Sequence, residues 1–361
     1  MTQLIRPGWA LLLGSMLASS VLAAESTPAR ALLALSKRDR TLAIIDPMSL
    51  KIVAKVPVGP DPHEVIAGAD GRFAYVSDYG GGAYHILSVV DLVQQKALPP
   101  IDLGPLGGPH GLAFVGGKLW FTAEGAKVIG SYNPNLRRVD WILGTGQDRT
   151  HMIYVFPDLK RMVTSNVSSG TMSIIEATVR RGFGPPSGVP PAPPGAGPGG
   201  PPPGVRPGFP QKDWEETVVK VGGGAEGFDI SPDGREIWAG NAQDGTISII
   251  DLASKKVTET LAANVRGANR LKFTPDGKQV FVSSLSNSDL AIFDAASRRE
   301  VKRVKLGRGA AGILMDPDGS RAFVACSPDN YVAVIDLKTL EVTGRFEPGN
   351  DPDGLAWAIR R

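Results

Sequence analysis

Three nine-residue stretches share one pattern, and this pattern decides the fold. They read Glu226-Gly-Phe-Asp-Ile-Ser-Pro-Asp-Gly234, Asn269-Arg-Leu-Lys-Phe-Thr-Pro-Asp-Gly277 and Ala311-Gly-Ile-Leu-Met-Asp-Pro-Asp-Gly319. Each begins with small or polar residues, continues as an apolar strand and ends in a Pro-Asp-Gly turn. Weaker copies of the pattern start at His63, His110 and His151. The chain is therefore built from repeats.

The spacing of the repeats predicts their architecture. The third strand of each copy ends in an acidic or amide residue, at Asp46, Asp91, Asn133, Glu176, Asp251, Asp294 and Asp336. Successive ends are 45, 42, 43, 75, 43 and 42 residues apart. A repeat near 43 residues with about four short strands is typical of a β-propeller blade. We predict an all-β, seven-bladed propeller; an open solenoid or stacked sandwiches are the alternatives.

The two ends of the chain predict how the ring closes. Three strands are expected first, at 31–35, 41–46 and 52–56, and one lone strand last, at 354–358. Together they would complete a four-stranded blade and remove the exposed edges of an open array.

Several strands resemble the YVTN-family β-propeller repeat of bacterial secreted proteins. The resemblance rests on Phe73-Ala-Tyr-Val-Ser-Asp78, Met162-Val-Thr-Ser-Asn166, Thr246–Asp251 and the Pro-Asp-Gly turns. It covers nearly all of the chain after residue 24 and implies the propeller fold. It implies no reaction, because one fold hosts many functions.

Composition excludes several classes of protein. The 361 residues are 42% hydrophobic and 21% charged with a net charge of +3, so neither a disordered chain nor a dedicated nucleic-acid binder is expected. The single cysteine, Cys326, excludes an internal disulfide framework, a Cys-rich zinc site and covalent c-type haem.

Residues 1–24 read as a Sec-type signal peptide. Arg6 precedes a short apolar run that ends in small residues, with cleavage expected after Ala23 or Ala24. A retained membrane anchor is the alternative. Residues 25–361 would then form a periplasmic or secreted propeller, expected to be a monomer without a membrane anchor.

A tract rich in proline and glycine interrupts one blade. Residues 182–210 contain 9 Gly and 12 Pro, and they account for the long 75-residue spacing. Such a composition cannot bury a core, so we expect a disordered, partly polyproline-II loop. It joins a third to a fourth strand and should lie on the face opposite the histidines. The tract is interpreted either as a docking site for a partner or as a tolerated insertion without a function of its own.

Three of the four histidines occupy the same repeat position. His63, His110 and His151 start innermost strands, and the series continues with Glu226, Asn269, Ala311 and Asp353. Innermost strands line the central channel, so these side chains should converge. Three imidazoles and Glu226 would suit a divalent transition metal, with Glu64 or Asp353 as a catalytic base. Turn capping without a metal is the alternative.

Further polar residues are candidates for ligand binding at the same mouth. Asn269 occupies the histidine position of its repeat and Arg270 follows it, Asp78, Asn166 and Asn241 end second strands, and Arg149 lies just before His151. We predict a module that binds a small molecule, a metal or a protein at this polar face. The alternative is a metal-dependent lyase, lactonase-type hydrolase or oxidoreductase, in which the metal polarises a carbonyl or activates water.

Overall fold

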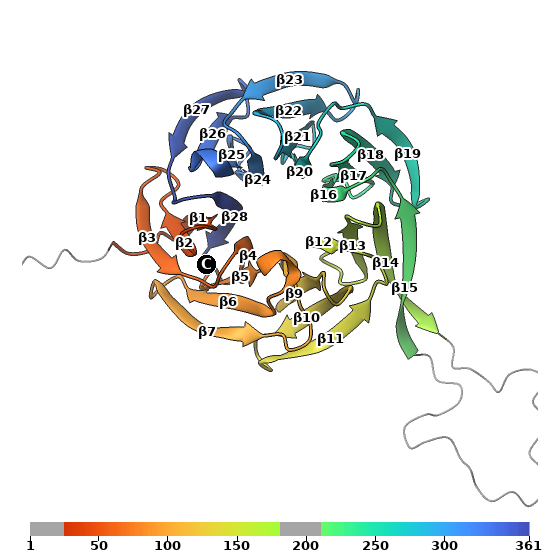
Figure 1. Ribbon diagram of the computed structural model, residues 1–361, viewed down its shortest axis with the longest axis horizontal. Helices are drawn as coiled ribbons and strands as arrows, with labels where there is room; N and C mark the ends of the chain where they lie inside the picture. Colours follow the sequence, from red (N-terminus) through yellow and green to blue (C-terminus); the bar gives the residue numbers. More distant parts are fainter. Residues whose placement is uncertain (1–24, 181–210, 361) are drawn as a thin grey trace, which may run out of the picture.

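Seven four-stranded antiparallel sheets form a ring around a central channel in the computed structural model (Figure 1). The structure describes residues 25–180 and 211–360. The predicted seven-bladed, all-β propeller is confirmed. The expected signal peptide and the Pro/Gly-rich tract lie outside the described residues. Within the described part of the chain, no helix is both long and apolar enough to cross a membrane.

The blades are numbered along the chain, and each is given from its innermost strand outward. Blade 1 contains β28 (Pro352–Ile359), β1 (Arg30–Ser36), β2 (Thr41–Ile45) and β3 (Ile52–Pro57). Blade 2 contains β4 (Pro62–Ala67), β5 (Phe73–Asp78), β6 (Ile86–Asp91) and β7 (Lys96–Asp102). Blade 3 contains β8 (Pro109–Val115), β9 (Lys118–Ala123), β10 (Val128–Asn133) and β11 (Arg138–Gly144). Blade 4 contains β12 (Thr150–Val155), β13 (Arg161–Asn166), β14 (Thr171–Arg180) and β15 (Gln211–Lys220).

The last three blades follow the same order. Blade 5 contains β16 (Ala225–Ile230), β17 (Glu236–Asn241), β18 (Thr246–Asp251) and β19 (Lys256–Leu261). Blade 6 contains β20 (Ala268–Phe273), β21 (Gln279–Ser284), β22 (Asp289–Asp294) and β23 (Glu300–Lys305). Blade 7 contains β24 (Ala310–Met315), β25 (Arg321–Cys326), β26 (Tyr331–Asp336) and β27 (Glu341–Phe346). The described residues also include the short 3-10 helices η1 (Gly80–Gly82) and η2 (Ser327–Asp329).

Ring closure follows the prediction. β28 pairs antiparallel with β1, with Leu32 opposite Trp357, so the two ends of the chain share blade 1. The core lies between neighbouring blades, where the alternating apolar side chains of the strands pack sheet on sheet. Trp238 of blade 5, for example, is fully buried and packs edge-on against Phe273 of blade 6 at 5.8 Å. Burial of these faces is the main stabilising contribution.

One hairpin is longer than the sequence pattern indicated. The third strand of blade 4 was expected to end at Glu176, but β14 continues to Arg180 and pairs with β15 as far as Gln211. The extension consists of four further backbone pairs, from Ala177–Trp214 to Arg180–Gln211. Trp214 also packs on Trp141 of β11 at 5.4 Å, which holds this hairpin against blade 3.

A β-bulge near the start of each innermost strand positions the residues that line the channel. In blade 3 the register shifts between Pro109 and Leu112, so His110 and Gly111 are not paired with β9. The Thr122 hydroxyl accepts the Gly111 N–H at 2.9 Å and donates to the His151 carbonyl of the next blade at 2.6 Å. Ser165 and Ser283 link their blades in the same way. The bulges therefore leave few backbone groups unsatisfied.

Gly111 tests this packing between blades. A Cβ at Gly111 would lie 2.5 Å from the His151 carbonyl oxygen, whereas a Cβ at Gly144 would meet nothing within 4 Å. We expect Gly111→Ala to lower the free energy of unfolding by about 1–3 kcal/mol, as in overpacked cores. Gly144→Ala, the matched control on β11, should leave it within about 0.5 kcal/mol of wild type. Urea unfolding measures both, and equal effects would contradict the packing.

Candidate functional site

Three histidines from consecutive blades meet at one mouth of the channel. The ring centroids of His63 and His110 are 5.2 Å apart, and those of His110 and His151 are 3.7 Å apart. His110 and His151 are buried, each with only 2% of its surface exposed. Tyr79 packs edge-on against both His63 and His110. The mouth is thus walled by aromatic and imidazole rings.

Two carboxylates flank His151. Its Nδ1 hydrogen-bonds to Oε1 of Glu124, and its Nε2 lies 3.3 Å from Oε1 of Glu226. The second contact has ion-pair distance but not the angles of a hydrogen bond, so Nε2 makes none within the described residues. The Tyr79 hydroxyl donates to Glu124 Oε2 at 2.6 Å. Tyr79, Glu124, His151 and Glu226 form a continuous polar chain along the mouth.

Burial and neighbouring charges set the protonation states of the imidazoles and carboxylates at the mouth. Burial lowers the pKa of His110 well below its usual value, and the neighbouring His151 lowers it further, so His110 is neutral at pH 7. Burial also opposes the charge on His151, but Glu124 and Glu226 outweigh it and raise its pKa. Burial alone would raise the pKa of Glu226; the contact with His151 reverses this and lowers it to about 2. A neutral imidazole therefore stacks beside one that favours its charged form.

Three buried polar atoms at the mouth lack a hydrogen-bond partner among the described residues. They are Nδ1 of His110, Nε2 of His151 and Oδ1 of Asn269. An unsatisfied buried polar group costs about 1–3 kcal/mol. Asn269 starts the innermost strand of blade 6, across the ring from blade 3. The unsatisfied atoms thus come from three blades that all line the same channel.

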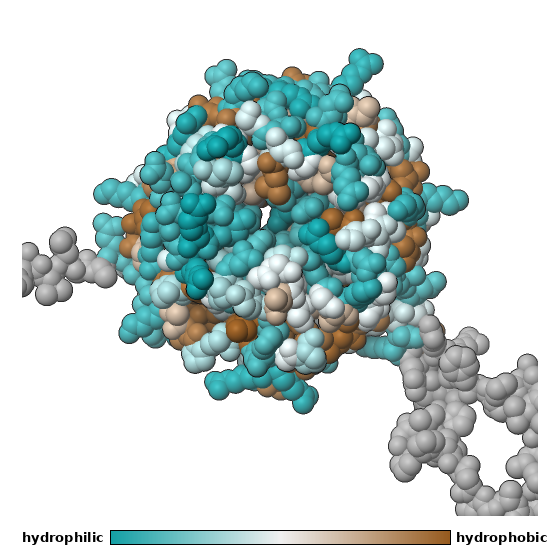
Figure 2. Space-filling model, viewed as in Figure 1, coloured by the Kyte–Doolittle hydropathy of each residue, from teal (hydrophilic) through white to brown (hydrophobic). Residues whose placement is uncertain are grey.

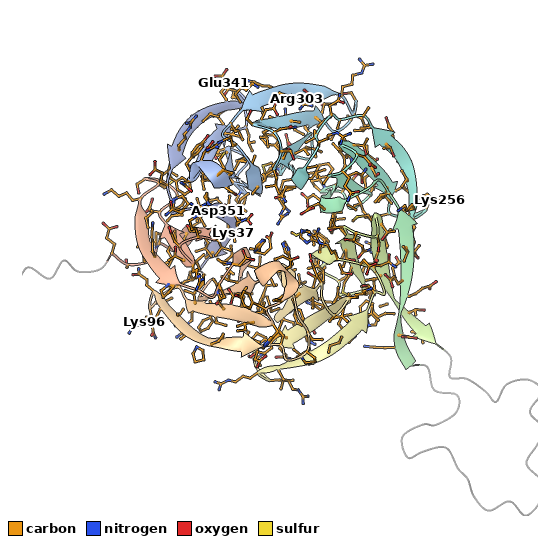
Figure 3. All side chains as sticks on the ribbon, in the orientation of Figure 1. Lys37, Lys96, Lys256, Arg303, Glu341 and Asp351 are labelled. Carbon is orange, nitrogen blue, oxygen red and sulfur yellow. The ribbon has the colours of Figure 1, made fainter. Side chains whose placement is uncertain are left out.

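An ion pair crosses the channel next to the histidines. Arg270 of blade 6 contacts Glu64 of blade 2, and their side chains are 7% and 14% exposed. Both residues line a cavity of about 350 Å³ whose other walls include Met152, Leu112 and Trp357. At the same mouth, Lys37 pairs with Asp353 of the innermost strand β28 at 3.0 Å. Figure 2 shows the hollow at the centre of the ring with mainly hydrophilic residues around it, and Figure 3 shows Lys37 beside it.

The structure brings most of the candidate residues together and leaves three apart. His63, His110, His151, Glu226, Glu64 and Arg270 face the channel, and Arg149 lies 3.4 Å from Glu124. Asn269 lies on the innermost strand β20, and Asp353, on the innermost strand β28, pairs with Lys37. Asp78, Asn166 and Asn241 do not join them, because they are fully buried and bond to hydroxyls on the third strands of their own blades. The expectation that these three form an outer rim is therefore not met.

Three residues of the site were not among the candidate residues named from the sequence. Tyr79 follows the end of β5, Glu124 follows the end of β9 and Lys37 follows the end of β1, in loops that share a face with the histidines. Reading one position beyond each second strand would have found all three. His85 lies apart, exposed and bonded to Asp102 at 2.8 Å. Cys326 is fully buried in blade 7.

The metal site stays a prediction. Within residues 25–180 and 211–360, no group of three or more His, Cys, Asp or Glu side chains is placed to hold a metal ion. His110 and His151 pack ring against ring, so shared ligation by them would require a ring to rotate. In its favour, the Nδ1 atoms of His63 and His151 contact a carbonyl and a carboxylate, as in metal-ligating histidines.

Fold and site together define a seven-bladed propeller with a polar cluster at one mouth of its central channel. Residues 210–321 match the family described as YNCE-like beta-propeller. This match and the seven blades confirm the resemblance to YVTN-type propeller repeat proteins. No curated protein matches the chain in sequence.

Solved structures share the fold at low sequence identity. A functionally unknown protein from Desulfotomaculum acetoxidans DSM 771 is 13% identical with a TM-score of 0.67, over 92% of this chain and 99% of that one. A proposed 6-phosphogluconolactonase from Bacteroides fragilis NCTC 9343 is 15% identical with a TM-score of 0.66, over the same shares. Hydrazine synthase of Kuenenia stuttgartiensis is 17% identical with a TM-score of 0.60, over 82% and 89%. At these identities the likeness concerns the fold alone.

Proposed function

We propose that the protein is a binding module that takes a small polar ligand at the channel mouth. The observation that carries the proposal is the set of buried atoms on His110, His151 and Asn269 that lack a hydrogen-bond partner among the described residues. Each is costly when left unsatisfied, so a ligand that pairs with them recovers free energy. The ring of blades holds them on strands rather than on loops, which favours a preformed site.

The polar groups define the class of ligand. Asn269 Oδ1 requires a donor, while the neutral imidazole of His110 can donate or accept according to its tautomer. The charged groups around them already pair with one another, Glu64 with Arg270 and Glu124 with Arg149. A compact neutral molecule that carries both hydroxyl donors and acceptors matches this pattern better than a strongly charged one.

A metal-dependent enzyme is the second candidate, favoured by the carboxylates on either side of His151. If a metal binds His63, His110, His151 and Glu226, Glu124 is the group that orients and polarises His151. The suggested bases are less free than expected: Glu64 is paired with Arg270, and Asp353 with Lys37. This second candidate covers a lyase, a lactonase-type hydrolase and an oxidoreductase.

We also propose that the protein works outside the cytoplasm. The support is residues 1–24 of the sequence, with their single arginine and small-residue end. Expression of the full chain with N-terminal sequencing of the exported product tests this, and a product that begins at residue 1 would contradict it.

Thermal shift with defined probes tests the binding proposal. The probes are D-glucose, succinate, inorganic phosphate and Zn²⁺, added separately to the full chain. We expect D-glucose, the neutral probe with hydroxyl donors and acceptors, to raise Tm more than succinate or phosphate, and His110→Ala to abolish that rise. His85→Ala is the matched control, since His85 is exposed and bonded to Asp102 away from the mouth, and it should keep the response. A response to Zn²⁺ alone would favour the metal-dependent enzyme; responses that survive His110→Ala would contradict both candidates.

A further inference from the structure

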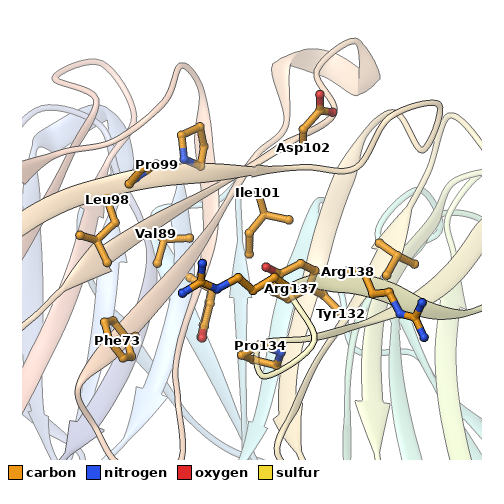
Figure 4. Close-up of a pocket in the computed structure, with 13 residues that line it drawn as sticks. Phe73, Val89, Leu98, Pro99, Ile101, Asp102, Tyr132, Pro134, Arg137 and Arg138 are labelled. Atoms are coloured by element: carbon orange, nitrogen blue, oxygen red, sulfur yellow. The ribbon is translucent and has the colours of Figure 1, made fainter.

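A groove between blades 2 and 3 has a chemistry that the channel site does not use. It has a volume of about 590 Å³ (Figure 4) and lies on the outer part of the ring, because most of its lining comes from the third and fourth strands β6, β7, β10 and β11. Aromatic and proline side chains line it from both blades, among them Phe73, Tyr75, Pro100, Tyr132 and Pro134. Arg137 and Arg138 are exposed at its rim.

The tyrosines give this groove a preference for an extended, proline-rich segment. The Tyr75 ring stacks on Phe114 at 5.8 Å, which fixes it in the floor. Neither the Tyr75 nor the Tyr132 hydroxyl hydrogen-bonds to another described residue. Burial raises the pKa of Tyr75 to about 12, so its hydroxyl stays protonated and can donate a hydrogen bond. A polyproline-II chain has no internal hydrogen bonds and presents its carbonyls as acceptors. Grooves lined by aromatic residues bind such segments through their proline rings.

The chain carries a segment of this chemistry nearby. Residues 182–210 include Val189-Pro-Pro-Ala-Pro-Pro194, which holds two overlapping P-x-x-P patterns. The segment joins β14 to β15, and the loop at Pro134 joins β10 to β11, so both connect third to fourth strands on the same face of the ring. The β14–β15 hairpin packs on blade 3 through Trp214 and Trp141.

The length of the segment is sufficient. Thirty residues separate Arg180 from Gln211, whose backbones are paired, so the segment leaves and returns at one place. About half of it can reach outward, or roughly 45 Å at a polyproline-II rise of about 3.1 Å per residue. The groove lies one to two sheet spacings from blade 4, or roughly 15–20 Å at a face-to-face spacing of about 10 Å, so the reach is sufficient.

We propose that the groove between blades 2 and 3 binds the proline-rich segment 182–210 of the same chain. A second groove makes a matched comparison. It lies between blades 5 and 6, the same number of blades from blade 4 in the other direction, with a volume of about 490 Å³. Its lining is charged instead, with Asp233, Glu236, Asp276 and Arg298. Docking that depends on tyrosine and proline rings should therefore select the first groove.

Disulfide trapping in the full chain tests the proposal. The native Cys326 is fully buried, so two introduced cysteines report on one another. Pro134→Cys with Ala192→Cys places a thiol in the first groove and one in the P-x-x-P block. Ala296→Cys with Ala192→Cys is the control, since Ala296 lines the second groove. We expect the first pair to form an intramolecular disulfide at least 10-fold faster than the control at the same mild oxidant concentration.

Two further results decide between recognition and mere proximity. Adding Pro190→Ser and Pro193→Ser, or Tyr132→Ala, should lower the trapping rate of the first pair at least 5-fold while the control pair is unchanged. Equal rates for the two pairs would overturn the proposal. So would covalent dimers that increase with protein concentration in place of the intramolecular product, because the segment of a second copy would then be the occupant.

Discussion

Glu64→Gln is expected to lower the free energy of unfolding by about 3–5 kcal/mol, the cost of leaving a buried charge without its partner. Arg270 is nearly inaccessible, and Glu64 is the carboxylate that it contacts across the channel. The double variant Glu64→Leu/Arg270→Met removes both charges and keeps apolar volume, so it should recover to within about 1 kcal/mol of wild type. Urea unfolding at pH 7 measures each variant.

An exposed ion pair provides the control for this first prediction. Arg235 and Asp233 contact each other with 82% and 56% of their side chains exposed, so Arg235→Met should change the free energy of unfolding by less than about 0.5 kcal/mol. If Glu64→Gln costs no more than Arg235→Met, the ion pair does not hold the channel together.

Asp78→Asn is expected to stabilise the protein at pH 8 and leave it almost unchanged at pH 4. Burial raises the pKa of Asp78 to about 7, although Ser88 donates a hydrogen bond to it. The folded pKa therefore exceeds the unfolded value of about 3.9. The wild type keeps its full stability below the unfolded pKa and loses it as pH rises through 4 to 7, by about 3–4 kcal/mol at pH 8. Asparagine is uncharged over this whole pH range, so the variant does not lose this stability as the pH rises.

The repeats supply an internal comparison for this second prediction. At the corresponding position of blade 5, Asn241 is equally buried and donates to the hydroxyls of Thr246 and Ser248. Asn241→Asp should bring in the pH dependence that Asp78→Asn removes. Unfolding midpoints measured from pH 4 to pH 8 check both variants. A wild-type curve that stays flat over this range would show that Asp78 is ionised throughout.

The sequence predicts the ring well because its signal is periodic. Turns and strand ends recur every 43 residues, and the innermost-strand position of each repeat places His63, His110 and His151 at one mouth, as the structure shows. A period identifies the face on which a residue lies, but not whether its side chain points at the channel or into the blade. For that reason Asp78 and Asn241, at equivalent ends of second strands, were expected at the rim and lie inside their blades.

Contacts across the ring lie beyond what the period can predict. Glu64 and Arg270 are 206 residues apart and belong to blades 2 and 6, and nothing in either repeat marks the other as its partner. The chain from Tyr79 through Glu124 to His151 joins three blades through side-chain rotamers. Such contacts depend on the diameter of the channel and the reach of each side chain, which emerge only when the ring is closed.

The most direct test of the channel-mouth site is ¹⁵N NMR of the imidazole nitrogens of the four histidines, recorded as the probe that raises Tm is added to the full chain. We predict that signals of His63, His110 and His151 change together along one saturation curve, because their rings share one site. The signal of His85, exposed and bonded to Asp102, should not move. Three separate curves, or a response of His85 equal to the others, would contradict a shared binding site.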